Sequence, residues 1–123
     1  MRTFIFDLDG TLVNSLPDIQ TAANKAFHAV NLPPRSLEEV RLHVGHGLDD
    51  FIKSINRPHI VTDRELSVIK TVYDEYYKNH LVDLTTVYEG VIDLLEKLRK
   101  MGCLLIIASN KTDLYVKIIA DKL

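Results

Sequence analysis

Residues 4–15 read FIFDLDGTLVNS, and this stretch decides how the rest of the chain is interpreted. Its first three residues are aromatic or β-branched, which is typical of a short buried strand. The run ends at Asp7, and a second carboxylate follows at Asp9. Because side chains two residues apart on an extended backbone point to the same side, we expect the two carboxylates to reach the same small volume.

Two carboxylates this close repel each other unless a cation lies between them. Magnesium suits one or two carboxylates together with a substrate phosphate. Gly10 allows close approach of the backbone, and Thr11 supplies a hydroxyl and a backbone donor. Taken alone, an Asp-x-Asp pattern is more often a strand-to-loop cap, since aspartate is common where strands end. The surrounding sequence favours a binding site instead.

Residues 15–82 carry the periodicity of an all-helical block of about four helices. Capping-box patterns predict three of the helix starts, at Ser15–Asp18, Ser36–Glu39 and Thr62–Glu65. Tyrosines at 73, 76 and 77 fall in the last of these helices, and we attribute them to helix packing.

A strand-and-helix pattern returns after residue 82. Gly90 precedes an amphipathic helix, and Gly102 fits a left-handed helix end. Residues 103–108 are a nearly continuous apolar run, which predicts a parallel strand covered on both faces. Without the helical block, the order is strand, helix, strand, helix. This order predicts a parallel sheet with a right-handed crossover.

Ligands of such sheets bind beyond the carboxyl ends of the strands. Asp7 and Asp9 lie at one predicted strand end, and Ser109, Asn110 and Lys111 follow the other. The second cluster offers a hydroxyl, an amide, a cation and backbone N–H groups to a phosphate. We therefore expect the two clusters to form one phosphoryl-transfer site.

The charge balance gives no indication of binding to nucleic acid or to an anionic membrane, since 15 basic and 17 acidic residues leave a net charge of −2. Asp7 comes too early for a signal peptide, and no stretch approaches the ~20 apolar residues that span a bilayer. We expect a cytoplasmic location. The single cysteine, Cys103, excludes an intramolecular disulfide, and its apolar neighbours predict a buried, inert thiol.

The sequence resembles a known family at several places. FDLDGTLVNS at residues 6–15 resembles the first signature of the haloacid dehalogenase superfamily. IIASNK at 106–111 resembles the second signature of its phosphoglycolate-phosphatase-like members. VGHGL at 44–48 is similar to their cap loop, and YEGV at 88–91 to the return into the core, although many members have proline where this chain has Glu89. Asn14 also stands where aspartate is more usual.

The resemblance implies an α/β fold with a partial Rossmann-like parallel-sheet core and an inserted all-helical cap domain. The core would comprise residues 1–14 and 83–123, and the cap residues 15–82. The implied enzyme is a magnesium-dependent phosphatase that hydrolyses a small phosphorylated metabolite, phosphoglycolate or a similar phosphate monoester. A phosphosugar mutase of the same superfamily and a non-catalytic domain that binds magnesium and phosphate are the alternatives.

The resemblance also assigns roles to residues. Asp7 would be the nucleophile that becomes an aspartyl-phosphate, and Asp9 the general acid and then the general base. Asp7 and the backbone carbonyl of Asp9 would hold Mg²⁺. Ser109 would donate to a phosphoryl oxygen, helped by backbone donors around Asn110. Lys111 would contact the substrate or the phosphate.

Gly10 and Thr11 complete the expected phosphate-binding loop, and the cap loop would close over it. His46 in that loop is a candidate substrate contact, with a solvent-exposed loop histidine as the alternative. His43 and His46 have helical spacing but no third ligand in the sequence, so we expect no zinc site.

Family members carry two further signatures, a lysine and an acidic pair, and nothing after Lys111 resembles either. We therefore expect the front part of a phosphatase. The strand at 3–7 would have only residues 103–108 as a parallel neighbour. Its open second edge would favour self-association.

Overall fold

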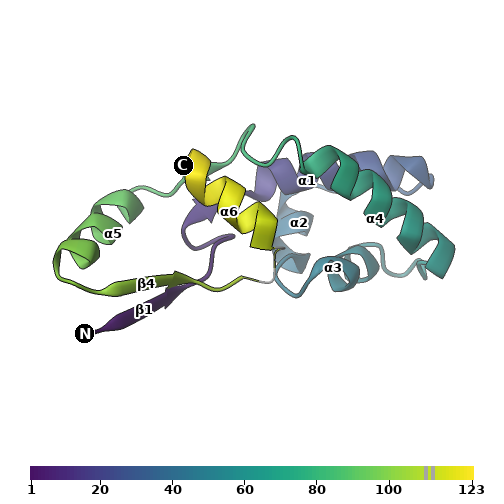
Figure 1. Ribbon diagram of the computed structural model, residues 1–123. Coiled ribbons are helices and arrows are strands. Elements are labelled where there is room, and N and C mark those ends of the chain that lie inside the picture. Colours follow the sequence, from purple (N-terminus) through teal and green to yellow (C-terminus); the bar gives the residue numbers. More distant parts are fainter. Residues whose placement is uncertain (110, 112) are drawn as a thin grey trace.

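The computed structural model describes residues 1–109, 111 and 113–123, and Figure 1 shows their arrangement. Two parallel strands and α5 lie at the end of the molecule that holds the N-terminus, and α1 to α4 lie toward the other end. None of the helices in these residues is long and apolar enough to cross a membrane. The elements in chain order are β1 (Thr3–Phe6), β2 (Val13–Asn14), α1 (Leu16–Ala29), α2 (Leu37–His43), α3 (Leu48–Ile55), α4 (Asp63–Tyr77), β3 (Thr86–Val87), α5 (Val91–Lys100), β4 (Leu104–Ile107) and α6 (Asp113–Lys122).

β1 and β4 pair in parallel, as the order of the elements predicts. The register ends with Phe6 opposite Ile107, and the backbone N–H of Ala108 donates to the carbonyl of Phe6 at 2.8 Å. The residues that come after each strand therefore lie at the same edge of the sheet. Within the described residues β1 pairs with β4 alone.

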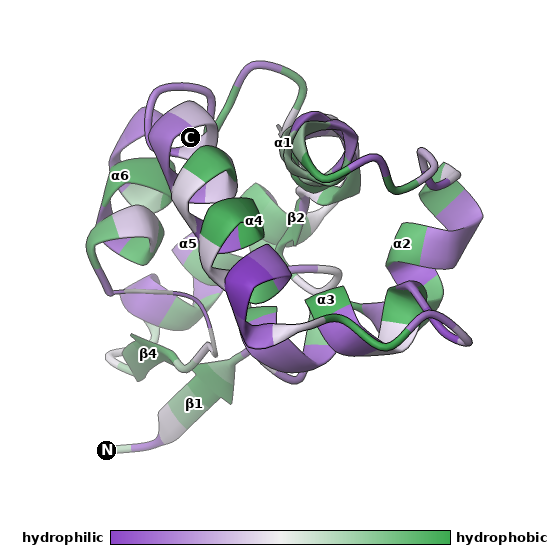
Figure 2. Ribbon diagram, turned by 90° about the vertical axis from the view of Figure 1, so that its right-hand side faces the viewer, coloured by the Kyte–Doolittle hydropathy of each residue, from purple (hydrophilic) through white to green (hydrophobic). Residues whose placement is uncertain are grey.

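The parallel strands are more exposed than the sequence predicts. Ile5 is 67% exposed and Leu104 45%, and Figure 2 shows β1 and β4 as hydrophobic arrows at one end of the molecule. The predicted coverage of residues 103–108 on both faces is wrong, because two strands and one short helix are too few layers to enclose these side chains. The same shortage leaves Cys103 half-buried, where the sequence predicts full burial.

The hydrophobic core lies mainly among the helices. Residues 15–82 are all described and contain four helices, as expected. The helix α1 packs along α4, and their buried side chains recur at helical spacing. Those of α1 include Ile19, Ala22, Ala23, Ala26 and Phe27, those of α3 are Phe51, Ile52 and Ile55, and those of α4 are Ile69, Tyr73 and Tyr77.

Two of the three predicted capping boxes are confirmed. The side chains of Ser36 and Thr62 accept from the backbone N–H three residues later, and the glutamates there accept from the N-cap backbone. The predicted box at Ser15–Asp18 is wrong, since Ser15 makes no side-chain cap bond. Its hydroxyl donates instead to Asp9, and the buried carboxylate of Asp18 accepts from residues 84–85. The Ser15 backbone is helical, with φ −95° and ψ −2°, whereas the two N-cap residues that form boxes are extended.

A short antiparallel pair joins the two ends of the helical segment. In this pair Val13 of β2 lies opposite Val87 of β3, and Asn14 lies opposite Thr86. The backbone N–H of Tyr88 extends the contact by donating to the carbonyl of Leu12 at 3.2 Å. The chain therefore leaves the strand end and returns to it at one place.

Candidate functional site

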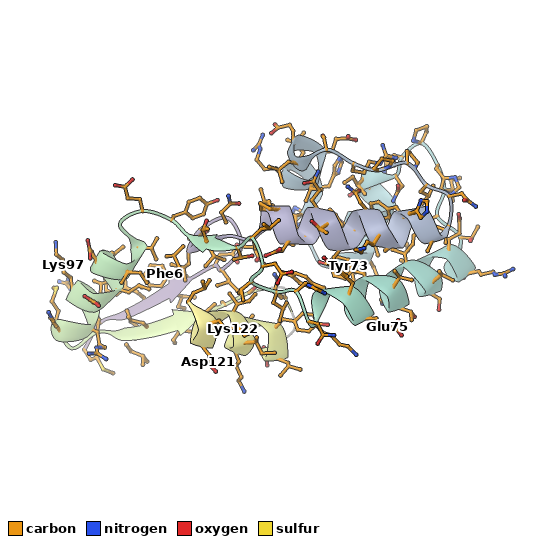
Figure 3. All side chains as sticks on the ribbon, turned by 90° about the horizontal axis from the view of Figure 1, so that it is seen from above. Phe6, Tyr73, Glu75, Lys97, Asp121 and Lys122 are labelled. Atoms are coloured by element: carbon orange, nitrogen blue, oxygen red, sulfur yellow. The ribbon has the colours of Figure 1, made fainter. Side chains whose placement is uncertain are left out.

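A cavity of about 320 Å³ lies where the ends of β1 and β4 face the helices. Its polar lining comes from the segments that follow β1 and β4 and from two of the helices, and it comprises Asp7, Asp9, Arg41, Asp74, Ser109 and Lys111. The rest of the wall is mainly apolar or aromatic, with residues from α1, α3, α4 and α6. Seen from above, Phe6 lies at the strand end of the molecule and Tyr73 among the helices (Figure 3). The cavity thus combines a few convergent polar groups with an apolar wall, which is the usual composition of a small-molecule site.

The loop after β1 is built around the carbonyl of Leu8, which accepts from the backbone N–H groups of residues 11–13. Leu8 itself is buried and anchors the loop to the core. Gly10 has φ 80°, a left-handed conformation that favours glycine. Asp7 stays at the surface, and its Oδ1 accepts from the N–H of Leu8 at 2.8 Å. This turn places Asp7 at the mouth of the cavity.

Asp9 is held by contacts from two other segments. The hydroxyl of Ser15 donates to its Oδ1. The ammonium of Lys111 lies 3.0 Å from the same oxygen. The carboxylate is therefore oriented by the start of α1 on one side and by the loop after β4 on the other.

Lys111 is the most buried cation of this site, with 8% of its side chain exposed. Burial lowers the pKa of its ammonium, and the neighbouring Asp9 carboxylate opposes that shift. Its Nζ also donates to the hydroxyl of Tyr77. The backbone N–H of Lys111 donates to Oγ of Ser109 at 3.1 Å, which turns the loop into the cavity.

The structure brings Asp7, Asp9, Gly10, Ser109 and Lys111 to one cavity, where the sequence places them. Asn110 lies outside the described residues. Both remaining candidates, Thr11 and His46, are exposed and are not among the cavity-lining residues. The predicted backbone donor of Thr11 is used within the loop, since its N–H donates to Leu8 at 3.3 Å. The glycines on either side of His46, Gly45 and Gly47, do line the cavity.

The sequence does not predict the aromatic wall of the site, nor the polar lining residues Arg41 and Asp74. Tyr73, Tyr77 and Tyr115 line the cavity, with ring centroids of Tyr73 and Tyr77 5.2 Å apart. Burial raises the pKa of the Tyr77 hydroxyl, so it stays protonated. The i, i+4 spacing of Tyr73 and Tyr77 indicates a shared helix face, whereas Tyr76 stacks on His80 away from them.

The carboxylate oxygens at the cavity suit magnesium better than a metal ion whose ligands are all protein side chains. Among the described residues, no group of three or more His, Cys, Asp or Glu side chains is arranged to hold a metal ion. Magnesium, however, takes one or two carboxylates and completes its coordination with water and substrate phosphate. Asp7 and Asp9 supply oxygen ligands of that kind at the cavity.

Comparisons with known proteins agree with this geometry. Residues 4–122 match the family model described as haloacid dehalogenase-like hydrolase. The chain is 35% identical to the phosphoglycolate phosphatase of Chromobacterium violaceum, over 100% of this chain and 57% of that protein. It is 34% identical to the enzyme of the same name from Pasteurella multocida, over 91% of this chain and 53% of that protein. The chain thus spans about half the length of the curated relatives that it matches.

Solved structures show the same fold. A Haemophilus somnus 129PT protein, predicted to be a phosphoglycolate phosphatase, superposes with a TM-score of 0.89 at 32% identity, over 99% of this chain and 56% of that one. A Bacteroides vulgatus protein assigned as a beta-phosphoglucomutase superposes with a TM-score of 0.71 at 21% identity, over 93% of this chain and 47% of that one. The second likeness concerns the fold alone.

Proposed function

Because this chain belongs to the haloacid dehalogenase-like hydrolase family, we propose that its site hydrolyses a small phosphate monoester. The observation that carries the proposal is the convergence of Asp7, Asp9, Ser109 and Lys111 on one cavity. Phosphoglycolate is the first substrate to test, since the relatives described above bear that name.

Asp7 is the proposed nucleophile. One of its carboxylate oxygens attacks phosphorus, the bond from phosphorus to the ester oxygen breaks, and an aspartyl-phosphate forms. The hydrogen bond from the N–H of Leu8 holds the carboxylate at the end of β1. Its exposed position leaves it open to an incoming phosphate.

Asp9 is the proposed acid and base. It gives a proton to the departing ester oxygen and later takes one from the water that attacks the aspartyl-phosphate. The water oxygen then bonds to phosphorus, inorganic phosphate leaves, and the Asp7 carboxylate is restored. Ser15 and Lys111 both contact Oδ1 of Asp9, so they orient the carboxylate for both transfers.

The Asp7 carboxylate and the backbone carbonyl of Asp9 are the proposed ligands of magnesium, with the substrate phosphate completing the site. When bound, the ion would shield the negative charge that gathers between the carboxylates and the phosphate. Ser109 is proposed to donate its hydroxyl to a phosphoryl oxygen, together with the Thr11 hydroxyl and the backbone near Asn110. These donors orient the phosphate toward Asp7.

We further propose that residues 1–14 and 83–123 form the core and residues 15–82 the cap. The antiparallel pair of β2 and β3 lies at that proposed boundary. The cap loop at 44–48 carries Gly45 and Gly47 to the cavity, and its closure would exclude water and bring His46 to the substrate.

The first experiment measures magnesium-dependent phosphate release from 2-phosphoglycolate by the 123-residue chain. Asp7→Asn is the test variant, and Asp121→Asn is the matched control because Asp121 is an exposed carboxylate of α6 outside the cavity. We expect release that requires magnesium, disappears in Asp7→Asn and persists in Asp121→Asn. A folded chain that releases no phosphate would show that this chain is not itself the enzyme.

A phosphosugar mutase of the same superfamily is the second candidate, as the resemblance of the sequence implies. Product identity separates the two functions. Incubation with a hexose monophosphate yields free phosphate from a phosphatase, but an isomeric sugar phosphate from a mutase. The third reading, a non-catalytic domain, predicts binding of phosphate and magnesium without either product.

A further inference from the structure

Tyr77 links the helices to the loop that carries Lys111. Its side chain is almost fully buried in α4, at 1% exposure, and its hydroxyl accepts a hydrogen bond from Nζ of Lys111. The same nitrogen lies 4.7 Å from the centroid of the Tyr77 ring. Tyr77 therefore engages the ammonium through its hydroxyl.

Neighbouring aromatic rings hold Tyr77 in this orientation. The ring of Tyr115 in α6 meets it edge-on, with centroids 5.6 Å apart. The hydroxyl of Tyr115 donates to Asp74 of α4 at 3.4 Å, which anchors that ring in turn. Tyr73 packs against Tyr77 one helical turn earlier. Packing from several directions leaves the Tyr77 hydroxyl little freedom to move away from Lys111.

We propose that Tyr77 is a positioning residue that holds the ammonium of Lys111 on the carboxylate of Asp9. The proposal rests on the proposed function, because it gives a tyrosine of the helical segment a part in the acid–base step of Asp9. A buried ammonium needs partners, and the side-chain partners in the described residues are Asp9 and Tyr77. Without the hydroxyl, Lys111 keeps one polar partner and Asp9 loses part of its orientation.

A double-mutant cycle measured by kcat separates a positioning role of Tyr77 from a role in packing alone. Tyr77→Phe keeps the ring and its packing but removes the hydroxyl. With 2-phosphoglycolate and magnesium, we expect Tyr77→Phe to lower kcat about tenfold, a partial loss of acid–base catalysis, and to leave KM unchanged. In the Lys111→Met background, adding Tyr77→Phe should lower kcat no further, since the hydroxyl acts through Lys111. Tyr76→Phe on the same helix is the matched control and should keep kcat, because Tyr76 stacks on His80 and does not line the cavity.

A second double-mutant cycle measures stability and needs no catalytic turnover. Tyr77→Phe should lower the urea midpoint of unfolding in the unchanged chain but not in the Lys111→Met background, where the hydroxyl has lost the ammonium. Equal shifts in both backgrounds would overturn the proposal, as would equal losses of kcat. If the unchanged chain shows no turnover while the urea cycle is non-additive, the proposed function fails and the positioning of Lys111 by Tyr77 stands.

Discussion

The carboxylate of Asp18 accepts hydrogen bonds from both the backbone N–H and the hydroxyl of Thr85, at 2.8 and 2.7 Å. These contacts join the first turn of α1 to the segment that leads back to the strands. The N–H of Leu84 donates to the same carboxylate at 2.9 Å, so a carboxyl group that is 3% exposed is satisfied by neutral donors. A charge buried in this way organises the backbone around it.

Asp18→Ala should therefore destabilise the fold. It leaves the backbone N–H groups of Leu84 and Thr85 without their acceptor, while the Thr85 hydroxyl keeps the carbonyl of Leu81, and we expect a loss of about 3 kcal/mol in the free energy of unfolding. Urea unfolding followed by circular dichroism measures it. Asp121→Ala, at an exposed position of α6, is the control and should change stability by less than about 0.5 kcal/mol. Similar losses for the two variants would contradict the importance of this contact.

Ser109→Ala tests the proposed phosphate contact. Removing one hydrogen-bond donor from a developing phosphoryl charge should lower kcat/KM for 2-phosphoglycolate about 100-fold. Ser67→Ala on the exposed side of α4 serves as the comparison and should retain full activity. If phosphate release by Ser109→Ala matches that of the unchanged chain, the hydroxyl does not bind the phosphoryl group.

Thr62→Ala tests the capping box of α4. Thr62 accepts from the N–H of Glu65 at 3.1 Å, and the loss of this bond should cost about 1 kcal/mol of stability. Thr71→Ala lies in the interior of the same helix, where alanine is the better helix former, and should be neutral or stabilising. The thermal midpoints of the two variants, compared in one buffer, check the prediction. An unchanged midpoint for Thr62→Ala would mean that solvent replaces the cap.

Ile5→Lys tests the proposed self-association through the open strand edge. A lysine on an edge strand disfavours pairing with another chain, so the variant should sediment as a monomer at concentrations where the unchanged chain associates. Ile60→Lys is the matched control, because Ile60 is 85% exposed outside the strands. Analytical ultracentrifugation over a concentration series gives the answer. If the unchanged chain is monomeric, or if both variants dissociate to the same extent, the result would contradict self-association through the strand edge.

The sequence predicts features that depend on local pattern. The parallel pairing of β1 with β4 follows from the order of elements, and the boxes at Ser36 and Thr62 follow from short-range chemistry. Topology alone also brings Asp7 and Ser109 to one cavity, since parallel strands end at the same edge.

Features that depend on distant partners could not be predicted. Ser15 carries a cap pattern, but its backbone is helical and its hydroxyl donates to the carboxylate of Asp9. Asp18 finds its donors 66 and 67 residues later in the chain. The tyrosine spacing identifies a helix face, but it does not say that Lys111 approaches that face.

The pairing of β2 with β3 brings the two ends of the helical segment to one junction. Because Asn14 and Thr86 are paired, the segment begins and ends at neighbouring points, and its length places no demand on the strands that precede and follow it. The number of residues between Asn14 and Thr86 can therefore change while this junction, and the strand end that carries Asp7 and Asp9, stays as it is.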